Sequence, residues 1–319
     1  MNLYWPIYKN LEQKLLELSE FIHFSDDQEN VYSLSISNLL IRTAVEIESL
    51  AKELYKLTGG NMTPVDESGK SRTLYFDQEC IQHLDVNWNI TKKVVYVVTP
   101  AFYFTQQENL ILKPLKNCDK PSKGRWKKAY QAIKHNRVES MRAGNIGNLI
   151  RAMAALYILN IYYRDEKFDI GTIAKSEPLD ARLGSEIFSV SLAHAEKCRF
   201  AEEMSDEGID DAVKRELDSS IYIQKYTDDA FEKLNRDMVE YNKHAGKILI
   251  EAPEVGAFLA SNPDYKVSNL IALARDAGGS QLVDKIMRCQ SILGSLPTAK
   301  MEAVLNKMQQ IYPTLGTSK

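Results

Sequence analysis

The stretch Leu149-Ile-Arg-Ala-Met-Ala-Ala-Leu-Tyr-Ile-Leu-Asn-Ile-Tyr-Tyr163 is strongly apolar and has the spacing of a helix. Its uninterrupted apolar run, residues 152–159, stops at Asn160 and is far shorter than the roughly 18 to 20 residues that a membrane span needs. We therefore expect a buried helix inside a soluble domain.

A long segment upstream has the apolar face to cover this helix. Ser25-Asp26-Asp27-Gln28 has the pattern of a capping box, which predicts a helix start, and Gly59-Gly60 supplies a typical helix end. The predicted helix runs from near Ser25 to Leu57, and a shorter one precedes it from about Pro6 to Phe21. The core of the first domain is then this long helix packed against residues 149–163.

Between these helices the hydrophobic period changes. Residues 93–99, 101–105 and 110–112 are β-branched and aromatic runs, broken by Pro100 and a polar turn. We expect a small β insertion at about residues 73–113.

For the rest of the chain, residues 169–319, the sequence predicts helices. Amphipathic stretches at helical spacing are separated by short turns at Pro253, Pro263, Gly278-Gly279 and Pro297. The predicted helices cover residues 185–203, 209–226, 229–250, 267–274, 281–293 and 298–311. The predicted fold is thus mainly α, with a helical bundle carrying a β insertion over residues 1–168 and a second all-helical domain over 169–319, whose role the sequence does not indicate.

Composition places the chain among ordinary globular proteins. It has 319 residues, 44% of them hydrophobic, and a net charge of -3. The four cysteines are far apart without a Cys-x-x-Cys, which fits neither a disulfide framework nor a thiolate zinc site, so we expect a cytoplasmic protein. His194, Cys198 and Glu202 could share a helical face as metal ligands, but such triplets are common on helices and we predict neither a metal nor another cofactor.

The small net charge hides a basic segment. Residues 113–142 carry ten Lys or Arg against two acidic residues, a net charge of +8, which leaves -11 for the rest. Within this segment lies Arg125-Trp-Lys-Lys-Ala-Tyr-Gln-Ala-Ile-Lys-His-Asn-Arg137. Basic residues interleaved with aromatic ones are typical of a surface that binds nucleic acid, although both aromatics also fit a core.

His135 is the candidate for proton transfer in this segment. If the helix continues past it, Lys128, His135 and Arg142 share a face and Arg137 points away. If the helix ends near Asn136, the turn can bring His135 and Arg137 together. An imidazole among cations suits an RNA phosphodiester, because the cations stabilise the charge of the transition state while the imidazole moves a proton. Alternatively, His135 simply caps a helix C-terminus.

The pattern Tyr130-x-x-x-Lys134-His135-x-Arg137, followed by the apolar helix 148–159, resembles the HEPN superfamily. The long helix with Arg42, Glu46 and Leu54-Tyr55 resembles the acidic helix beside that motif. This resemblance covers about residues 10–165. It implies a helical bundle that forms a homodimer and a metal-independent endoribonuclease of a toxin or anti-phage system.

The resemblance also assigns roles to particular residues. His135 would be the general acid or base, Arg137 the phosphate ligand, Asn136 a polar motif residue and Glu46 an orienting carboxylate, although Arg42 and Glu46 also form an ordinary i,i+4 pair. The residues expected to bind RNA are Arg125, Trp126, Lys127, Lys128, Tyr130, Lys134 and Arg142.

Two functions follow as expectations. The first is an endoribonuclease that cleaves RNA by attack of the ribose 2′-hydroxyl, with an antitoxin or another defence protein as partner. The second is a non-catalytic HEPN-like scaffold or sensor that binds RNA, a nucleotide or a protein.

Overall fold

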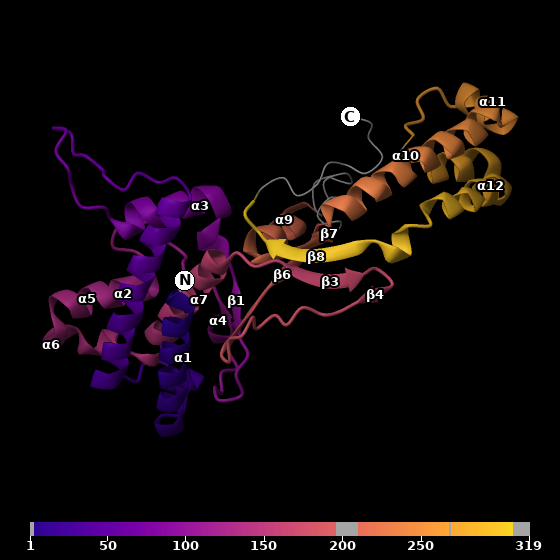
Figure 1. The fold of residues 1–319 in the computed structure, drawn as a ribbon. Coiled ribbons are helices and arrows are strands. Elements are labelled where there is room, and N and C mark those ends of the chain that lie inside the picture. The colour runs from indigo at the N-terminus through magenta and orange to yellow at the C-terminus, as the bar shows by residue number, and fades with distance from the viewer. Residues whose placement is uncertain (1–2, 196–209, 268, 309–319) are drawn as a thin grey trace. The chain divides into compact units, whose positions relative to one another are not determined.

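The computed structural model describes residues 3–195, 210–267 and 269–308. The protein is mainly helical with two β-sheets. Its chain divides into two compact units (Figure 1). Of the described residues, the first comprises 3–167, 179–195, 210–224 and 304–308, and the second comprises 168–178, 225–267 and 269–303. Where the sequence suggested one boundary after residue 168, the chain therefore passes between the units several times.

The first unit is built around helix α7 (Ile146–Arg164). Every residue from Ile146 to Tyr162 is buried except Arg151. Helices α1 (Tyr4–Phe21), α2 (Leu34–Leu57) and α5 (Arg125–His135) all contact α7, and α2 contacts it most extensively. A helix that is apolar on all sides must be enclosed by others, which confirms the predicted core of residues 149–163 against the long upstream helix.

Local signals fix the ends of these helices. The Asn145 side chain accepts a hydrogen bond from the amide of Asn148 and so caps α7, and Asp165, at φ 49°, ends it. The predicted start of α2 at Ser25 is wrong. Residues after Ser25 form a single 3-10 turn (Asp26–Gln28), and α2 begins only after Ser33, whose hydroxyl accepts from the amide of Ile36. Both serines match the N-cap pattern, and only the second leads into a continuous apolar face.

Short helical turns connect these long helices. They are a 3-10 turn (Ile90–Lys92), a π-helical turn (Phe76–Ile81) that leads into α3 (Gln82–Trp88), α4 (Gln107–Leu110), α6 (Arg137–Ser140) and a 3-10 turn (Met141–Ala143).

A three-stranded antiparallel sheet of order β2-β1-β5 completes the core of this unit. Strand β1 (Val95–Val97) pairs with β2 (Ile111–Leu112) in register Val95 to Leu112, and with β5 (Phe188–Val190) in register Val95 to Val190. The expectation of a small β insertion at about residues 73–113 is therefore wrong, because one strand of this sheet comes from residues 188–190. The predicted run over 101–105 contributes an isolated bridge between Tyr103 and Ser25.

Further strands replace the helices predicted in the C-terminal half. In the first unit, strand β6 (Leu192–His194) pairs in parallel with residues 222–224 of β7 (Tyr222–Tyr226). Helix α9 (Asp210–Ser219) precedes β7 in the chain. In the second unit, β3 (Phe168–Thr172) pairs with β4 (Lys175–Ser176) and with Lys300–Ala303 of β8 (Lys300–Leu305). The prediction of an all-helical region over 169–319 is therefore wrong.

Of the helices predicted in the second unit, residues 229–250 form α10 (Asp228–Glu251). The two helices predicted at 267–274 and 281–293 fall largely within one helix, α12 (Leu270–Arg288), which is followed by 3-10 turns at Cys289–Leu293 and Leu296–Thr298. Helix α11 (Pro253–Ser261) lies where the sequence analysis predicted no helix. Residues of α10, α11 and α12 form one apolar cluster, and α12 bends at Gly279, where φ is 60°. None of the helices in the described part of the chain is both long enough and apolar enough to cross a membrane.

Among the described residues of the first unit, the ionisable side chain of Lys93 lies unpaired in the core. Lys93 precedes β1, is completely buried, and its Nζ has no hydrogen-bond partner. Burial lowers the pKa of this amine to about 7, with Asp218 acting in the opposite direction. The folded protein therefore holds Lys93 mostly neutral above neutral pH.

We expect Lys93→Met to stabilise the protein, and to do so more at pH 7 than at pH 10. The unfolded chain binds a proton at Lys93 up to its ordinary pKa, so the free energy of unfolding of the wild type rises with pH across this window. The gap between variant and wild type should shrink by on the order of 3 kcal/mol from pH 7 to pH 10 in urea denaturation. Lys92→Met, at a half-exposed lysine paired with Asp218, is the control. A difference in the free energy of unfolding between Lys93→Met and wild type that does not change with pH would contradict a buried, neutral Lys93 amine.

Candidate functional site

The basic segment folds as a helix that breaks at Asn136. Helix α5 starts after Gly124, whose φ of 85° suits glycine, and ends at His135. Asn136 leaves the helical region, with φ -146° and ψ 79°, and α6 (Arg137–Ser140) begins directly afterwards. The sequence left two geometries open, and the structure has the second one: the helix ends near Asn136.

Asn136 is fixed by a carboxylate that sequence reasoning missed. Its Oδ1 accepts from the amide of Glu139, and its Nδ2 donates to Glu139 Oε2 at 2.6 Å. Asn followed three residues later by Glu is a capping pattern, which was the available signal. This reciprocal pair holds the break that separates His135 from Arg137.

His135 and Arg137 both lie on the surface, one on each side of the break. Within the described residues, neither side chain makes an ion pair or a hydrogen bond. Lys128 and Arg142 are also exposed and unpaired by the same criterion. Lys134 is exposed, with its Nζ 5.3 Å from the centre of the Tyr130 ring. The helix end and the turn after it therefore carry several accessible cations and one accessible imidazole.

Three of the predicted RNA-binding residues lie in the core instead. Trp126, Lys127 and Tyr130 are each at most 2% exposed. The indole of Trp126 donates to the carbonyl of Pro114 at 2.8 Å, and burial raises the pKa of Tyr130, as does nearby Glu48. Neither aromatic ring is accessible for stacking on a base, which corrects their expected place on an RNA-binding surface. Both lie on the face of α5 that packs against the bundle.

Lys127 anchors the loop that precedes α5. Its Nζ donates to Asp77 Oδ2 at 2.9 Å, to the carbonyl of Cys118 at 2.9 Å and to the carbonyl of Lys120 at 2.6 Å. All three donor positions of the ammonium are thus satisfied inside the protein. Lys127 therefore has a structural role, whereas its neighbour Lys128 faces solvent.

Arg125 is engaged by an acidic residue from the start of the chain. Its guanidinium forms an ion pair with Glu29 Oε1, and Arg151 Nη1 donates to the same oxygen at 2.9 Å. Arg151 also donates to Asn109 Oδ1 at 2.9 Å. Because of this contact, Arg125 belongs to a network that joins α5 and α7.

Glu46 lies on a different face of α2 from the one that approaches α5. The face of α2 toward α1 carries Arg42 and Ser49, and Ser49 hydrogen-bonds to a tyrosine of α1. The helical repeat places Glu46 within about 40° of Arg42, so Glu46 belongs to the same face. Glu48, roughly 200° away from Glu46, is the carboxylate near Tyr130 of α5. The structure therefore does not bring Glu46 to His135, contrary to the role that the resemblance implied.

The described residues contain no group of His, Cys, Asp and Glu side chains arranged to hold a metal ion. His194 is at the exposed end of strand β6. Cys198 and Glu202, its proposed companions, lie outside the described residues.

Comparison with protein-family models, with curated proteins and with solved structures gave no match to this chain. The resemblance to the HEPN superfamily therefore stays a prediction from the motif.

We expect adjacent lysines of α5 to differ in their effect on stability. Lys127→Met leaves Asp77 and two carbonyls without their donor, and should lower the free energy of unfolding by about 2–4 kcal/mol. Lys128→Met should change it by less than about 0.5 kcal/mol. Urea denaturation followed by circular dichroism compares the two variants. Equal effects would show that Lys127 does not anchor the loop.

Proposed function

We propose that the end of α5 and the turns after it bind RNA, and that His135 and Arg137 cleave it. The observation that carries this proposal is an exposed imidazole and an exposed guanidinium on the two sides of a fixed helix break, both unpaired within the described residues.

The charge around this break favours a polyanion. Of the ten basic residues between 113 and 142, all but Lys127 are exposed. The rest of the chain is acidic, so positive potential is concentrated on this part of the first unit. Binding to phosphates releases their counterions, which supplies affinity without any reading of sequence.

The reaction needs only the groups present and the substrate's own ribose. His135 takes the proton from a 2′-hydroxyl while the 2′-oxygen forms a bond to the adjacent phosphorus. Arg137 and a neighbouring lysine stabilise the added charge on the phosphoryl oxygens. The bond from phosphorus to the 5′-oxygen then breaks, and the leaving oxygen takes a proton from water. The products are a 2′,3′-cyclic phosphate and a 5′-hydroxyl, and His135 returns its proton to solvent.

The biological setting of the proposal comes from the motif resemblance. A cytoplasmic homodimer acting as a toxin or in anti-phage defence, restrained by an antitoxin or another defence protein, would be the corresponding system. No cofactor is part of this proposal.

Replacement of His135 tests cleavage directly. Purified His135→Ala should cleave a mixed RNA substrate at least about 100-fold more slowly than the wild type, because proton transfer is lost. Arg137→Ala should lose about 100-fold through weaker charge stabilisation. Gel analysis in EDTA, with mapping of cyclic phosphate ends, measures both.

His244→Ala is the matched control. His244 is an exposed histidine on α10 of the second unit, near Glu240, and its loss should leave the rate unchanged. Cleavage that survives in His135→Ala, or a wild type that leaves RNA intact, would contradict the nuclease proposal.

A second candidate is RNA binding without cleavage. It is favoured by the position of Glu46 on another face of α2 and by the ion pair that occupies Arg125, since the resemblance assigned a role to both residues and no contact joins either of them to His135 within the described residues. On this alternative, the same surface serves a scaffold or sensor.

The salt dependence of binding tests the surface whichever candidate holds. In the double variant Lys128→Gln, Arg142→Gln, the slope of log affinity against log salt should fall by about 1.4 for single-stranded RNA, because two phosphate contacts are lost. Lys243→Gln, at an exposed lysine of α10, should leave the slope unchanged. Fluorescence anisotropy with a labelled oligoribonucleotide measures it. An unaltered slope in the double variant would exclude this surface.

A further inference from the structure

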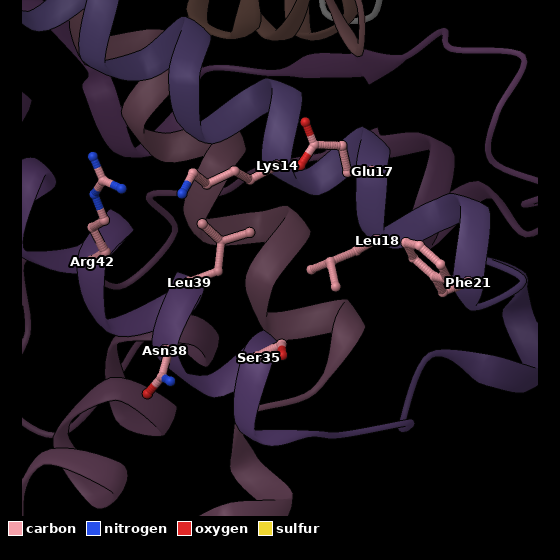
Figure 2. A pocket seen from close by; sticks show the side chains of 8 residues that line it. All are labelled: Lys14, Glu17, Leu18, Phe21, Ser35, Asn38, Leu39 and Arg42. Atoms are coloured by element: carbon pink, nitrogen blue, oxygen red, sulfur yellow. The ribbon is translucent and has the colours of Figure 1, made fainter.

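A cavity lies between helices α1 and α2 (Figure 2). Its volume is about 390 Å³, within the range of small-molecule sites. The side chains that line it are Lys14, Glu17, Leu18 and Phe21 of α1, and Ser35, Asn38, Leu39 and Arg42 of α2. The RNA surface proposed above is formed by other residues, at the end of α5 and in the turns after it.

The two helices run antiparallel along this cavity. The hydroxyl of Tyr4, at the start of α1, forms a hydrogen bond of 3.2 Å with Ser49 Oγ in the second half of α2. The helical repeat places Lys14 and Phe21 on one face of α1, two turns or about 10 Å apart along the axis. Lys14 therefore lies at the same end of the cavity as Arg42, and Phe21 lies at the other end, as Figure 2 shows.

The end formed by Lys14 and Arg42 is cationic. Both side chains are exposed, and in Figure 2 the Lys14 ammonium extends toward the side on which Arg42 lies. Within the described residues no carboxylate forms an ion pair with either of them. The carboxylate of Glu17 is turned away from α2 in Figure 2. An ammonium and a planar guanidinium at one place can bind the two oxygens of a carboxylate from a ligand.

Apolar side chains lead from the cationic end to the other end. In Figure 2, Leu18 and Leu39 lie between the two cations and Phe21, while Ser35 and Asn38 lie to one side of this line. The ring of Phe21 is 83% exposed, although contact with water is unfavourable for it. A ligand lying along this line would meet a continuous apolar path after the cations.

The shape of this apolar path favours a thin ligand over a protein surface. Leu39 is only 7% exposed and Leu18 is half-buried, so a flat partner would reach little apolar area besides the Phe21 ring. A stable protein interface buries about 800 Å² on each partner. A hydrocarbon chain that lies between the helices reaches all three side chains.

The order of these groups matches one class of ligand, which has an anionic head and an apolar tail about 10 Å long. We propose that this cavity binds a free monocarboxylic acid with an unbranched chain of medium length. Its carboxylate lies on Lys14 and Arg42, and its chain passes Leu18 and Leu39 to Phe21. This ligand is additional to RNA, and its binding does not depend on cleavage.

Calorimetric titration of the full chain with sodium octanoate tests the proposal. We expect saturable binding of one octanoate per chain. Along the series from butanoate to octanoate, affinity should rise about 2- to 4-fold for each added methylene group, because each one buries further apolar surface. Octanol and octylamine have the same chain without the carboxylate, and should bind at least about 10-fold more weakly.

Three variants locate the head and the tail of the ligand. Lys14→Gln and Arg42→Gln should each weaken the binding of octanoate and of butanoate about 10-fold, because both acids have the carboxylate. Phe21→Ala should weaken the binding of octanoate about 3- to 10-fold and leave that of butanoate unchanged, because only the longer chain reaches the ring. All three side chains are exposed, so these variants should fold, which circular dichroism checks.

Each of these variants has a matched control. Lys56→Gln, at an exposed lysine of the same helix α2, and Lys128→Gln, on the RNA surface, should both leave octanoate binding unchanged. Val86→Ala removes an apolar side chain of α3 that is 81% exposed, and should also have no effect. The matched pairs separate this cavity from general attraction of an amphiphile to exposed lysines or apolar side chains.

Several results would overturn the proposal. They are the absence of saturation by octanoate up to about 10 mM, an affinity that does not depend on chain length, and octanol that binds as tightly as octanoate. Equal loss of affinity in Lys56→Gln and Lys14→Gln would also overturn it. A dimer that Phe21→Asp separates in sedimentation velocity, without any octanoate binding, would instead assign this cavity to a contact between two copies of the chain.

Discussion

The complete burial of α7 is the constraint on which the first unit depends. A helix without a solvent-facing side gains stability only if other elements cover it all round, because an exposed apolar face is costly in water. Helices α1, α2 and α5 supply this cover. The position of α5 on the core explains why Trp126 and Tyr130 are buried, and why the cations that remain accessible are those at its far face and its end.

The single interruption in this burial is also the centre of a polar network. Arg151 is the one residue between Ile146 and Tyr162 that is not fully buried, and burial together with nearby Arg125 lowers its pKa, against the effect of Glu29. Glu29 balances both guanidiniums, so a carboxylate from the loop before α2 links the start of α5 to the middle of α7. Removing one member of such a partly buried set leaves the others without compensation.

Sequence alone was sufficient where a pattern is local. The buried helix at 149–163 and the existence of its long partner follow from periodicity. The start of that partner was misplaced at Ser25, and the helix end at Asn136 was one of two geometries that the sequence left open. Sequence alone failed for residues 300–305, because Met, Glu, Ala and Leu favour helices locally while pairing with β3 decides the outcome. It also failed for residues 188–194, where pairing with β1 and β7 decides the outcome. At the site, sequence identified the exposed His135 and Arg137. It did not separate Lys127 from Lys128, because one of them has partners in Asp77 and two loop carbonyls that no sequence pattern reveals.

The path of the chain through its two units makes the first unit dependent on residues far beyond 168. Strand β1 has β5 as a neighbour, and the hydroxyl of Tyr162 on α7 donates to the carbonyl of Asn306 at 2.7 Å. The Asn306 side chain in turn donates to the carbonyls of Leu217 and Ser220. Residues 225–303 thus form an insertion whose two ends both return to the first unit. The smallest fragment that keeps the core of α7 intact is therefore one in which this insertion is excised and its ends are joined, rather than one cut after residue 168.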